Sequence, residues 1–271
     1  MAKENLVLLH GVAVGDTTVK YANDKQTPAR VMLYLRVVDR AVDDDGRNEI
    51  QYATIFVYSG DPKIIQEAIE IEAGDLVDVF GTLTTTSVKK QRTCPSCGAV
   101  NIATGDVSYV SPTYICRREH GLSAEETEQL LIKRCEFSNR IVLIGHINNT
   151  PKYNDHHGLR NPTLIYQMAV DRTVRVKDGT SNDRKDYPWV VTSGIQAVEG
   201  KDALEKGSVV YVKGHLRSKE QVKEVQCEKC NNVFTAADFP LIQITPHFTE
   251  YIYNCNFPEA TKVPPTQGES N

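Results

Sequence analysis

The 271-residue sequence lacks any long apolar run: no stretch approaches the roughly 18 consecutive apolar residues that a membrane-spanning helix requires. Its first residues, MAKENLVLLHG, contain only a short apolar segment and no small-residue cleavage site. We therefore expect no signal peptide, no membrane partner and a cytoplasmic protein. The sequence also has no strong excess of one charge, since its formal net charge is −4, and this value gives no positive support for phosphate binding.

Motifs of common enzymes are absent as well. The sequence contains no P-loop, no G-x-G-x-x-G after a strand, no G-x-S-x-G and no H-E-x-x-H. His156 and His157 fall in a polar turn, and the acidic run at 43–45 lacks the later Glu that a calcium loop requires. Because neither a nucleophile–base pair nor an open metal site is evident, we expect a protein that is not an enzyme.

What the sequence does contain is an internal duplication. Blocks of similar sequence recur in the same order and at nearly constant spacing, which is the signature of two copies of one unit. In one block, both copies end in Val-Asp-Arg, and Tyr34 of the first copy aligns with Tyr166 of the second. The paired blocks are NLVLLHGVA (5–13) with NRIVLIGHI (139–147), RVMLYLRVVDR (30–40) with TLIYQMAVDR (163–172), YATIFVYSG (52–60) with YPWVVTSG (187–194), IEAGDLVDVFGTLTT (71–85) with LEKGSVVYVKGHLRS (204–218), and TCPSCG (93–98) with QCEKCN (226–231).

Each copy is predicted to be mostly strand, because β-branched and aromatic runs alternate with Gly, Asn, Asp and Pro. One short helix falls between the third and fourth strands of each copy, at 62–72 and 198–207. Three strands, a helix and two further strands is the order of the OB-fold, a five-stranded Greek-key barrel. The sequence therefore predicts an all-β chain of two tandem OB-fold barrels, each with a short helix and a zinc-ribbon-like hairpin insertion, joined by a linking helix.

The linking helix begins with Ser123 and Glu126 in the spacing of a capping box. The end of the chain is Pro-rich and polar, with nothing to bury, and we expect it to be disordered. The predicted divisions are 1–120 for the first OB-fold domain with its zinc-ribbon insertion, 121–138 for the linking helix, 139–256 for the second OB-fold domain with its C-x2-C insertion, and 257–271 for the tail.

These motifs resemble the bacterial single-stranded-DNA-binding protein family. The resemblance is carried in the second copy by NRIVLIGHINNTPKY, the MAVDR strand end, DYPWVV and LEKGSVVYVKGHLRS, and less closely in the first by NLVLLHGVAVGD, LRVVDR, QYATIFVYSG and AGDLVDVFGTL. Familiar members have one such module per chain and assemble as oligomers, so this chain resembles a covalent pseudo-dimer of that arrangement. It lacks the family's acidic, Phe-ended tail and carries inserted cysteine pairs, which makes a plasmid, phage or transposable-element version at least as well supported as a housekeeping one.

The resemblance implies sequence-nonspecific binding and protection of single-stranded DNA in replication, recombination, or conjugative or mobile-element transfer. RNA is an alternative ligand, because stacking faces do not distinguish the two sugars. A competing hypothesis is a zinc-stabilised OB-fold scaffold that mediates protein–protein contacts in a replication or conjugation complex, which the acidity of the first copy keeps open. Further copies of the chain and proteins of such complexes are the candidate protein partners.

Strand alternation independently predicts an aromatic surface. Since alternate residues of a strand face opposite ways, Tyr52, Phe56 and Tyr58 share one face while the aliphatic residues between them face the core. Unpaired bases stack on such rings at roughly 1–3 kcal/mol each. The second copy offers Tyr187 and Trp189, and Tyr52 and Tyr187 fall where the family places stacking aromatics. Alternatively, the rings pack under a loop, another subunit or the linking helix.

Cationic side chains are expected to flank these rings and to follow the phosphates. They concentrate near strand ends and in the hairpin after the fourth strand of each copy. Arg36 and Arg175 are favoured among them, because Arg also stacks on bases. The candidates are Arg36, Arg40, Lys89, Lys90 and Arg92 in the first copy, and Arg172, Arg175, Lys177, Lys213, Arg217 and Lys219 in the second.

Seven cysteines, with two pairs spaced C-x2-C, indicate a metal site in a reducing compartment rather than a disulfide framework. In the first copy, Cys94, Cys97, Cys116 and His120 have the spacing of a structural zinc ribbon, which takes four nitrogen or sulfur ligands. We therefore expect structural Zn²⁺, with one or two ions per chain.

The second copy supplies a weaker pattern. Cys227 and Cys230 form a half-site, and His247 and Cys255 are the nearest candidates to complete it. An alternative arrangement joins Cys227 and Cys230 to the C-x2-C pair of the first copy in one four-cysteine site that bridges the copies. Cys135 falls in the linking helix and is expected to be buried there.

Overall fold

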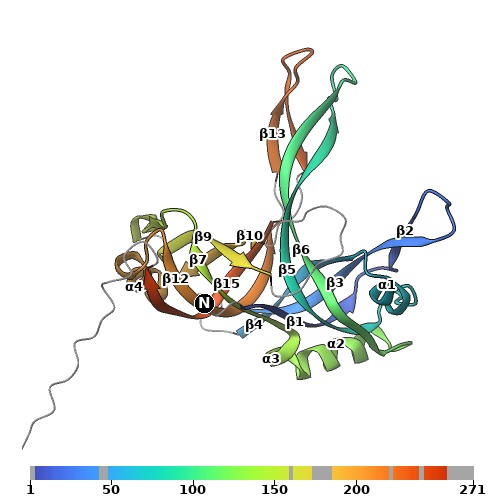
Figure 1. Cartoon of the computed structure of the whole chain (residues 1–271), viewed down its shortest axis with the longest axis horizontal. Coiled ribbons are helices and arrows are strands. Elements are labelled where there is room, and N and C mark those ends of the chain that lie inside the picture. The colour runs from blue at the N-terminus through green and yellow to red at the C-terminus, as the bar shows by residue number, and fades with distance from the viewer. Residues whose placement is uncertain are drawn as a thin grey trace, which may run out of the picture.

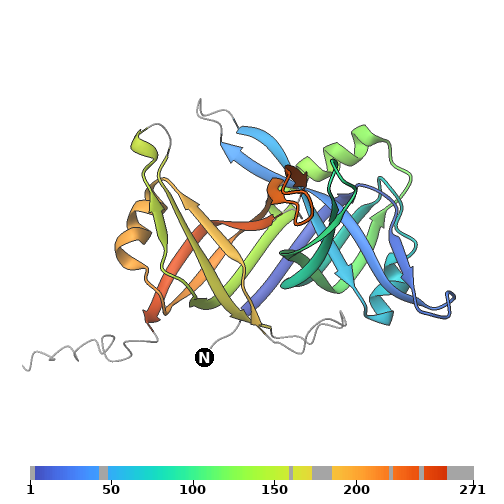
Figure 2. The same cartoon turned by 90° about the horizontal axis from the view of Figure 1, so that it is seen from above.

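The computed structural model describes residues 4–42, 48–158, 161–172, 185–219, 222–237 and 241–254. Two strand-rich units lie side by side and meet along their first strands (Figures 1 and 2). We call the elements up to Glu119 unit one and those from Asn139 onward unit two. In the described ranges, no helix has both the length and the apolar character that a membrane crossing requires.

Unit one consists of six strands and a short helix, and two helical segments lead from it to unit two. The elements of unit one are β1 (Glu4–Ala13), β2 (Thr18–Tyr21), β3 (Pro28–Val42), β4 (Asn48–Ser59), α1 (Pro62–Ala68), β5 (Leu76–Thr93) and β6 (Val100–Glu119); the link contains α2 (Ala124–Lys133) and α3 (Cys135–Ser138). Unit two contains β7 (Asn139–Ile147), β8 (Lys152–Asn154), the 3-10 turn η1 (His156–Gly158), β9 (Thr163–Asp171), β10 (Lys185–Asp186), β11 (Trp189–Ser193), α4 (Ile195–Ala203), β12 (Ser208–Lys219), β13 (Val222–Gln226), β14 (Val233–Ala237) and β15 (Leu241–Asn254).

Both units close into the same barrel. In unit one, β1 pairs with β5 and β3, β5 pairs with β6, and β6 meets β4 in parallel where Val110 lies opposite Val57. In unit two, β7 pairs with β12 and β9, β12 pairs with β15, and β15 meets β11 in parallel. The repeated topology confirms the all-β prediction of two tandem OB-fold barrels.

The two barrels share one sheet. Strand β1 pairs antiparallel with β7, from Glu4 opposite Ile144 to Leu9 opposite Asn139. At each end of this joint an asparagine side chain continues the ladder: the Asn5 amide donates to Leu83 O at 2.9 Å and the Asn139 amide donates to Leu216 O at 2.7 Å. The main-chain N–H of Leu83 donates in turn to Asn5 Oδ1, and that of Leu216 donates to Asn139 Oδ1. The joint is thus built twice from equivalent residues, and a single core cluster runs through both units.

The predicted alignment of Tyr34 with Tyr166 is wrong. Tyr34 lies opposite Phe56 on an outer face, whereas Tyr166 lies opposite Val190 and is fully buried. The residue of β9 that matches Tyr34 by register is Gln167, because Arg36 lies opposite Val12 of β1 and Ala169 lies opposite the equivalent His146 of β7. A shift of one residue exchanges the faces of a strand, so the shared Val-Asp-Arg motif aligned the two copies one position out of step.

The short helices between the third and fourth barrel strands form as predicted, although α1 and α4 have bounds that differ from those expected. The linking helix begins at the predicted capping box, in which the hydroxyl of Ser123 accepts from Glu126 N and the Glu126 carboxylate accepts from Ser123 N. It ends at Lys133, and Cys135, predicted to be buried, is half-buried at the start of α3.

Candidate nucleic-acid interface and metal centre

Four aromatic rings form one cluster on the outer face of unit one, and we call them the aromatic face. Tyr34 stacks on Phe56 with a centroid separation of 5.0 Å and an interplanar angle of 25°. Tyr58 meets Tyr109 edge-on at 5.2 Å. Tyr34 is 47% exposed, Phe56 and Tyr58 are half-buried, and Tyr109 is buried beside them.

The alternation that placed Phe56 and Tyr58 on this face is present in β4, where the intervening Ile55 and Val57 are buried in the core. Sequence reasoning missed Tyr34 and Tyr109, because they come from β3 and β6. Their place on the face depends on cross-strand register, which a single strand pattern does not give.

Tyr52 lies under the linking helix, which is the alternative that the sequence left open. Its hydroxyl donates to Glu128 Oε1 of α2 at 2.8 Å, and its ring packs against a small apolar cluster that includes Val38 and Leu131. The Arg36 guanidinium lies 5.0 Å from the centre of the same ring. Partial burial, followed by the bond to Glu128, raises the pKa of the Tyr52 phenol. The environment of Tyr52 is therefore that of a packing contact between β4 and α2.

Replacing Tyr52 with alanine is expected to lower the free energy of unfolding by about 2 kcal/mol, since it removes both the ring and the bond to α2. The matched control is Tyr187→Ala, because Tyr187 is 42% exposed, and it is expected to cost less than about 1 kcal/mol. Urea titration followed by circular dichroism measures both values. Equal, small losses in the two variants would show that α2 does not depend on Tyr52.

The corresponding surface of unit two carries Tyr187, which is exposed, and Trp189, which is half-buried. Tyr187 is held through its main chain: its N–H donates to Thr85 Oγ1 at 2.8 Å, and its carbonyl accepts from Gln167 Nε2 at 3.2 Å. Since Thr85 belongs to β5, the second aromatic surface lies directly against a strand of unit one.

The predicted cations fall into separate groups. Lys89, Lys213 and Lys219 are exposed and Lys90 is half-buried, whereas Arg92 is buried. Arg172 and Arg217 are held by carboxylates. Arg175 and Lys177 lie outside the described residues, and for Arg40 only the main chain is described, within β3.

Two buried carboxylates hold these arginines at the junction between the units. Asp39 of β3 accepts from Arg217 Nε at 2.7 Å and lies 2.8 Å from His215 Nε2, both on β12. Burial opposes ionisation of Asp39, but the bonds from His215 and Arg217 hold its pKa below the ordinary value. Asp186 of β10 binds Arg172 Nε at 2.6 Å and accepts from the main-chain N–H of Thr85, on β5, at 2.7 Å. Each unit thus inserts a carboxylate against the fourth barrel strand of the other, a contact that no sequence motif indicated.

Four cysteines from both units meet at the tips of two hairpins. Cys94 and Cys97 lie in the turn between β5 and β6, and Cys227 and Cys230 in the turn between β13 and β14. The first turn is closed by a bond from Cys94 N to Ala99 O at 2.8 Å and the second by a bond from Cys227 N to Asn232 O at 2.9 Å. The two turns therefore present their thiols in the same way.

The sulfur positions fit a metal ion. Cys94 Sγ lies 3.7 Å from Cys230 Sγ, Cys97 Sγ lies 3.6 Å from Cys227 Sγ, and all four lie within 4.8 Å of one another. A tetrahedron with metal–sulfur bonds of about 2.3 Å has sulfur–sulfur edges of about 3.8 Å. Bonds from main-chain N–H groups, that of Cys230 foremost, lower the pKa of Cys227 to about 6 and favour its thiolate. At Cys230 a bond from Asn232 N acts in the same direction, but the neighbouring thiols, that of Cys97 foremost, raise its pKa to about 12.

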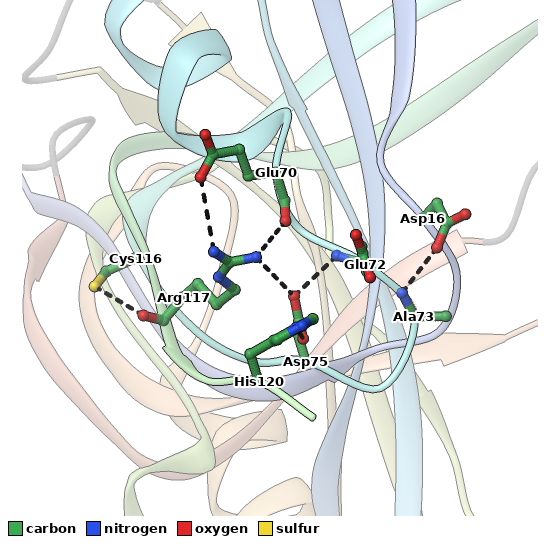
Figure 3. A network of polar contacts seen from close by, with 8 residues as sticks. All are labelled: Asp16, Glu70, Glu72, Ala73, Asp75, Cys116, Arg117 and His120. Atoms are coloured by element: carbon green, nitrogen blue, oxygen red, sulfur yellow. Dashed lines mark hydrogen bonds and ion pairs between the residues drawn. The ribbon is translucent and has the colours of Figure 1, made fainter. Parts of the chain in front are cut away.

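This arrangement is the bridging alternative, and the zinc ribbon predicted within unit one is wrong. Figure 3 shows Cys116 donating to the carbonyl of Arg117, in a polar network that also contains His120 and Asp75. Cys116 lies opposite Asp78 at the base of the β5–β6 hairpin, while Cys94 follows Thr93 at its tip. The residues after Cys97 continue as one long strand instead of folding back, and at roughly 3.3 Å per residue this separates the two cysteines by tens of ångströms.

The separate second site is likewise not assembled in the described ranges. His247 Nε2 lies 3.2 Å from His215 Nδ1, beside the Asp39 network, and is not in the cysteine group. Cys255 lies outside the described residues.

Comparison with known proteins agrees with this architecture. Residues 138–239 match the model of the single-strand binding protein family, which confirms the resemblance found in the second copy. A deletion variant of the single-stranded DNA binding protein from Thermus aquaticus superimposes with a TM-score of 0.62 at 16% identity, covering 98% of this chain and 100% of that one. The wild-type protein of the same organism gives 0.59 at 16% identity, covering 94% and 95%. At this identity the two structures establish the fold, over both units.

Proposed function

We propose that the protein binds single-stranded DNA without sequence preference, through the aromatic face of unit one and through Tyr187 and Trp189 of unit two. Its mechanism is stoichiometric coating and protection, in which no bond is made or broken. Replication, recombination and mobile-element transfer are the processes in which such coating is required. The match of unit two to the single-strand binding protein family supports this proposal.

The observation that carries the proposal is the aromatic face. Tyr34 leaves nearly half of its surface in water while it stacks on Phe56, and the aliphatic side chains on the opposite face of β4 already fill the core. Exposed rings add little to the stability of a barrel that is packed without them. They do offer flat apolar surfaces to unpaired bases, each stack contributing roughly 1–3 kcal/mol.

Exposed lysines supply the charge that such binding requires. Lys213 and Lys219 lie on β12 and Lys89 on β5, so both units contribute. For each phosphate that the protein contacts, the logarithm of the binding constant is expected to fall by about 0.7 for each tenfold rise in salt concentration. Because two of the predicted arginines, Arg172 and Arg217, are held by carboxylates, we expect a shallow salt dependence, with stacking as the larger contribution to affinity.

Fluorescence polarisation with labelled oligo-dT and with duplex DNA, over a series of salt concentrations, tests this function. We expect binding to oligo-dT and little binding to duplex. Tyr34→Ala and Trp189→Ala are each expected to weaken oligo-dT binding about tenfold, since one lost stack of about 1.4 kcal/mol corresponds to that factor. Tyr21→Ala is the matched control, because Tyr21 is 52% exposed but lies on β2, away from both aromatic surfaces. Equal affinity in all three variants would exclude stacking at these rings.

A protein-binding scaffold is the second candidate function. The observation that favours it is a set of exposed aliphatic side chains on the hairpins, namely Val100, Ile102 and Val233, each more than half exposed. Such side chains suit a protein surface better than a phosphate backbone. A folded chain that fails to bind oligo-dT in the same titration would favour the scaffold.

We further infer that Zn²⁺ is the ion that the four cysteines hold. A closed set of four thiolates suits zinc in a structural role, in which the ion supplies tetrahedral coordination and no redox chemistry. A reducing cytoplasm is the compartment that this inference requires, because it keeps the thiols available.

A further inference from the structure

Two hairpins project from the body of the molecule side by side, and we call them the arms (Figure 1). The arm of unit one is the part of the β5–β6 hairpin beyond Thr85, and the arm of unit two is the β13–β14 hairpin. The two arms belong to different sheets, and within the described ranges no ladder of main-chain bonds joins them. Contacts that involve side chains must therefore hold the two arms together.

The contacts that link the arms are concentrated at their tips. The close sulfur pairs are crossed, since Cys94 lies near Cys230 and Cys97 near Cys227. Asn101 of β6, which is buried, adds a polar link: its Nδ2 lies 3.7 Å from Cys227 Sγ, and its Oδ1 accepts from Glu228 N at 3.2 Å. Each unit provides two of the four sulfur ligands of this group. The coordination of an ion here is therefore complete only when both arms meet.

At its base, the arm of unit one touches the aromatic surface of unit two. Thr85 marks this point, because its hydroxyl accepts from Tyr187 N and its main-chain N–H donates to the buried Asp186. The strand between Thr85 and Cys94 is a continuous part of β5. One continuous strand therefore connects the cysteine group to the main chain of Tyr187.

We propose that a single zinc ion joins the two units, and that it is thermodynamically coupled to nucleic-acid binding through β5 and Thr85. The coupling rests on the proposed function, whereas the shared ion does not. Because the ion needs ligands from both arms, its binding favours the arrangement in which the arms lie together. In that arrangement β5 is placed so that Thr85 accepts the bond from Tyr187 N. By linkage, nucleic acid bound on Tyr187 must then strengthen zinc binding by the same factor.

Metal analysis of the full-length chain after dialysis tests the shared ion. We expect about one zinc per chain, and we expect Cys94→Ser and Cys227→Ser each to lose all of it, because each removes a ligand of the same tetrahedron. Cys116→Ser is the matched control and is expected to keep the ion, since Cys116 lies outside the group. Two zinc ions per chain, or retention of one ion by either ligand variant, would overturn the single shared site.

Oligo-dT titration of the zinc-loaded and chelator-treated wild-type chain tests the coupling, with circular dichroism to verify that both forms are folded. We expect removal of zinc to weaken binding at least about fivefold, the lower end of typical coupling between sites. In the Thr85→Val variant, which lacks the bond to Tyr187 N, the effect of zinc is expected to shrink towards onefold. Equal affinity of the two wild-type forms, an undiminished zinc effect in Thr85→Val, or a chelator-treated chain that has unfolded would overturn the coupling. A zinc-loaded chain that does not bind oligo-dT at all would overturn the proposed function and the coupling with it, while the one-ion result would stand.

Discussion

Replacing Asp186 with alanine is expected to lower the free energy of unfolding by about 3–5 kcal/mol. The Asp186 carboxylate has no exposed surface and receives two bonds from Arg172, at 2.6 and 2.8 Å, and one from Thr85 N at 2.7 Å. Its removal takes away the carboxylate that binds the buried Arg172 guanidinium through two bonds, and breaking such a buried pair costs more than the pair itself contributes. Urea unfolding near neutral pH measures the loss.

Glu199→Ala is the control for Asp186, because Glu199 is an exposed carboxylate on α4 and its removal is expected to change stability by no more than about 0.5 kcal/mol. A second comparison isolates the cost of removing the carboxylate while the charge of Arg172 remains. If Arg172 is replaced with methionine in the Asp186→Ala background, part of the lost stability is expected to return, since both charged partners are then gone. If Asp186→Ala lowered the free energy of unfolding no more than Glu199→Ala does, Arg172 would have to be hydrated in the variant, and the prediction would be wrong.

Alanine at Gly81 or at Gly214 is expected to cost more than about 3 kcal/mol, at the upper end of the range for overpacking. A Cβ atom on Gly81 would lie 2.3 Å from Ser111 O, and one on Gly214 would lie 2.3 Å from Thr245 O. Both obstacles are main-chain atoms, which cannot turn away as a side chain can. Both glycines also stand at a shift of register, where a bulge brings the neighbouring strand close.

Thermal unfolding of the two variants measures this cost, and Gly15→Ala is the control, because no atom lies within 4 Å of a Cβ built there. Since the two sites are equivalent in the two units, we expect similar losses in both. A melting temperature like that of wild type in either variant would mean that the bulge relaxes at little cost.

The duplicated architecture could be predicted because it depends on local patterns. Repeated blocks indicated two units, and the spacing of Gly, Pro and β-branched residues indicated strands in the OB-fold order. Alternation along one strand was enough to assign Phe56 and Tyr58 to the outer face. Each of these conclusions comes from short segments read by themselves or compared with one another, and none requires knowledge of which segments touch in the fold.

The contacts between distant segments could not be predicted in the same way. Cys94 and Cys116 share a hairpin, and only the uninterrupted length of β6 carries them apart, while Cys227 reaches Cys97 from the other unit. Tyr52 has the alternation of a surface residue, but α2, far along the chain, covers it. The burial of Asp186 depends on Arg172 and on a strand of unit one. No periodic pattern in the sequence predicts a contact between such distant segments.

The pairing of β1 with β7 has a consequence for how the protein behaves at low concentration. In a dimer of separate chains, a shared sheet of this kind forms by collision and is lost on dilution. Here both strands belong to one polypeptide, so each meets the other at an effective concentration on the order of millimolar, however few molecules are present. The two halves are also free to diverge, since a substitution in one is not copied into the other. The contact of α2 with Tyr52 of unit one, while Tyr187 of unit two stays exposed, is an example of that freedom.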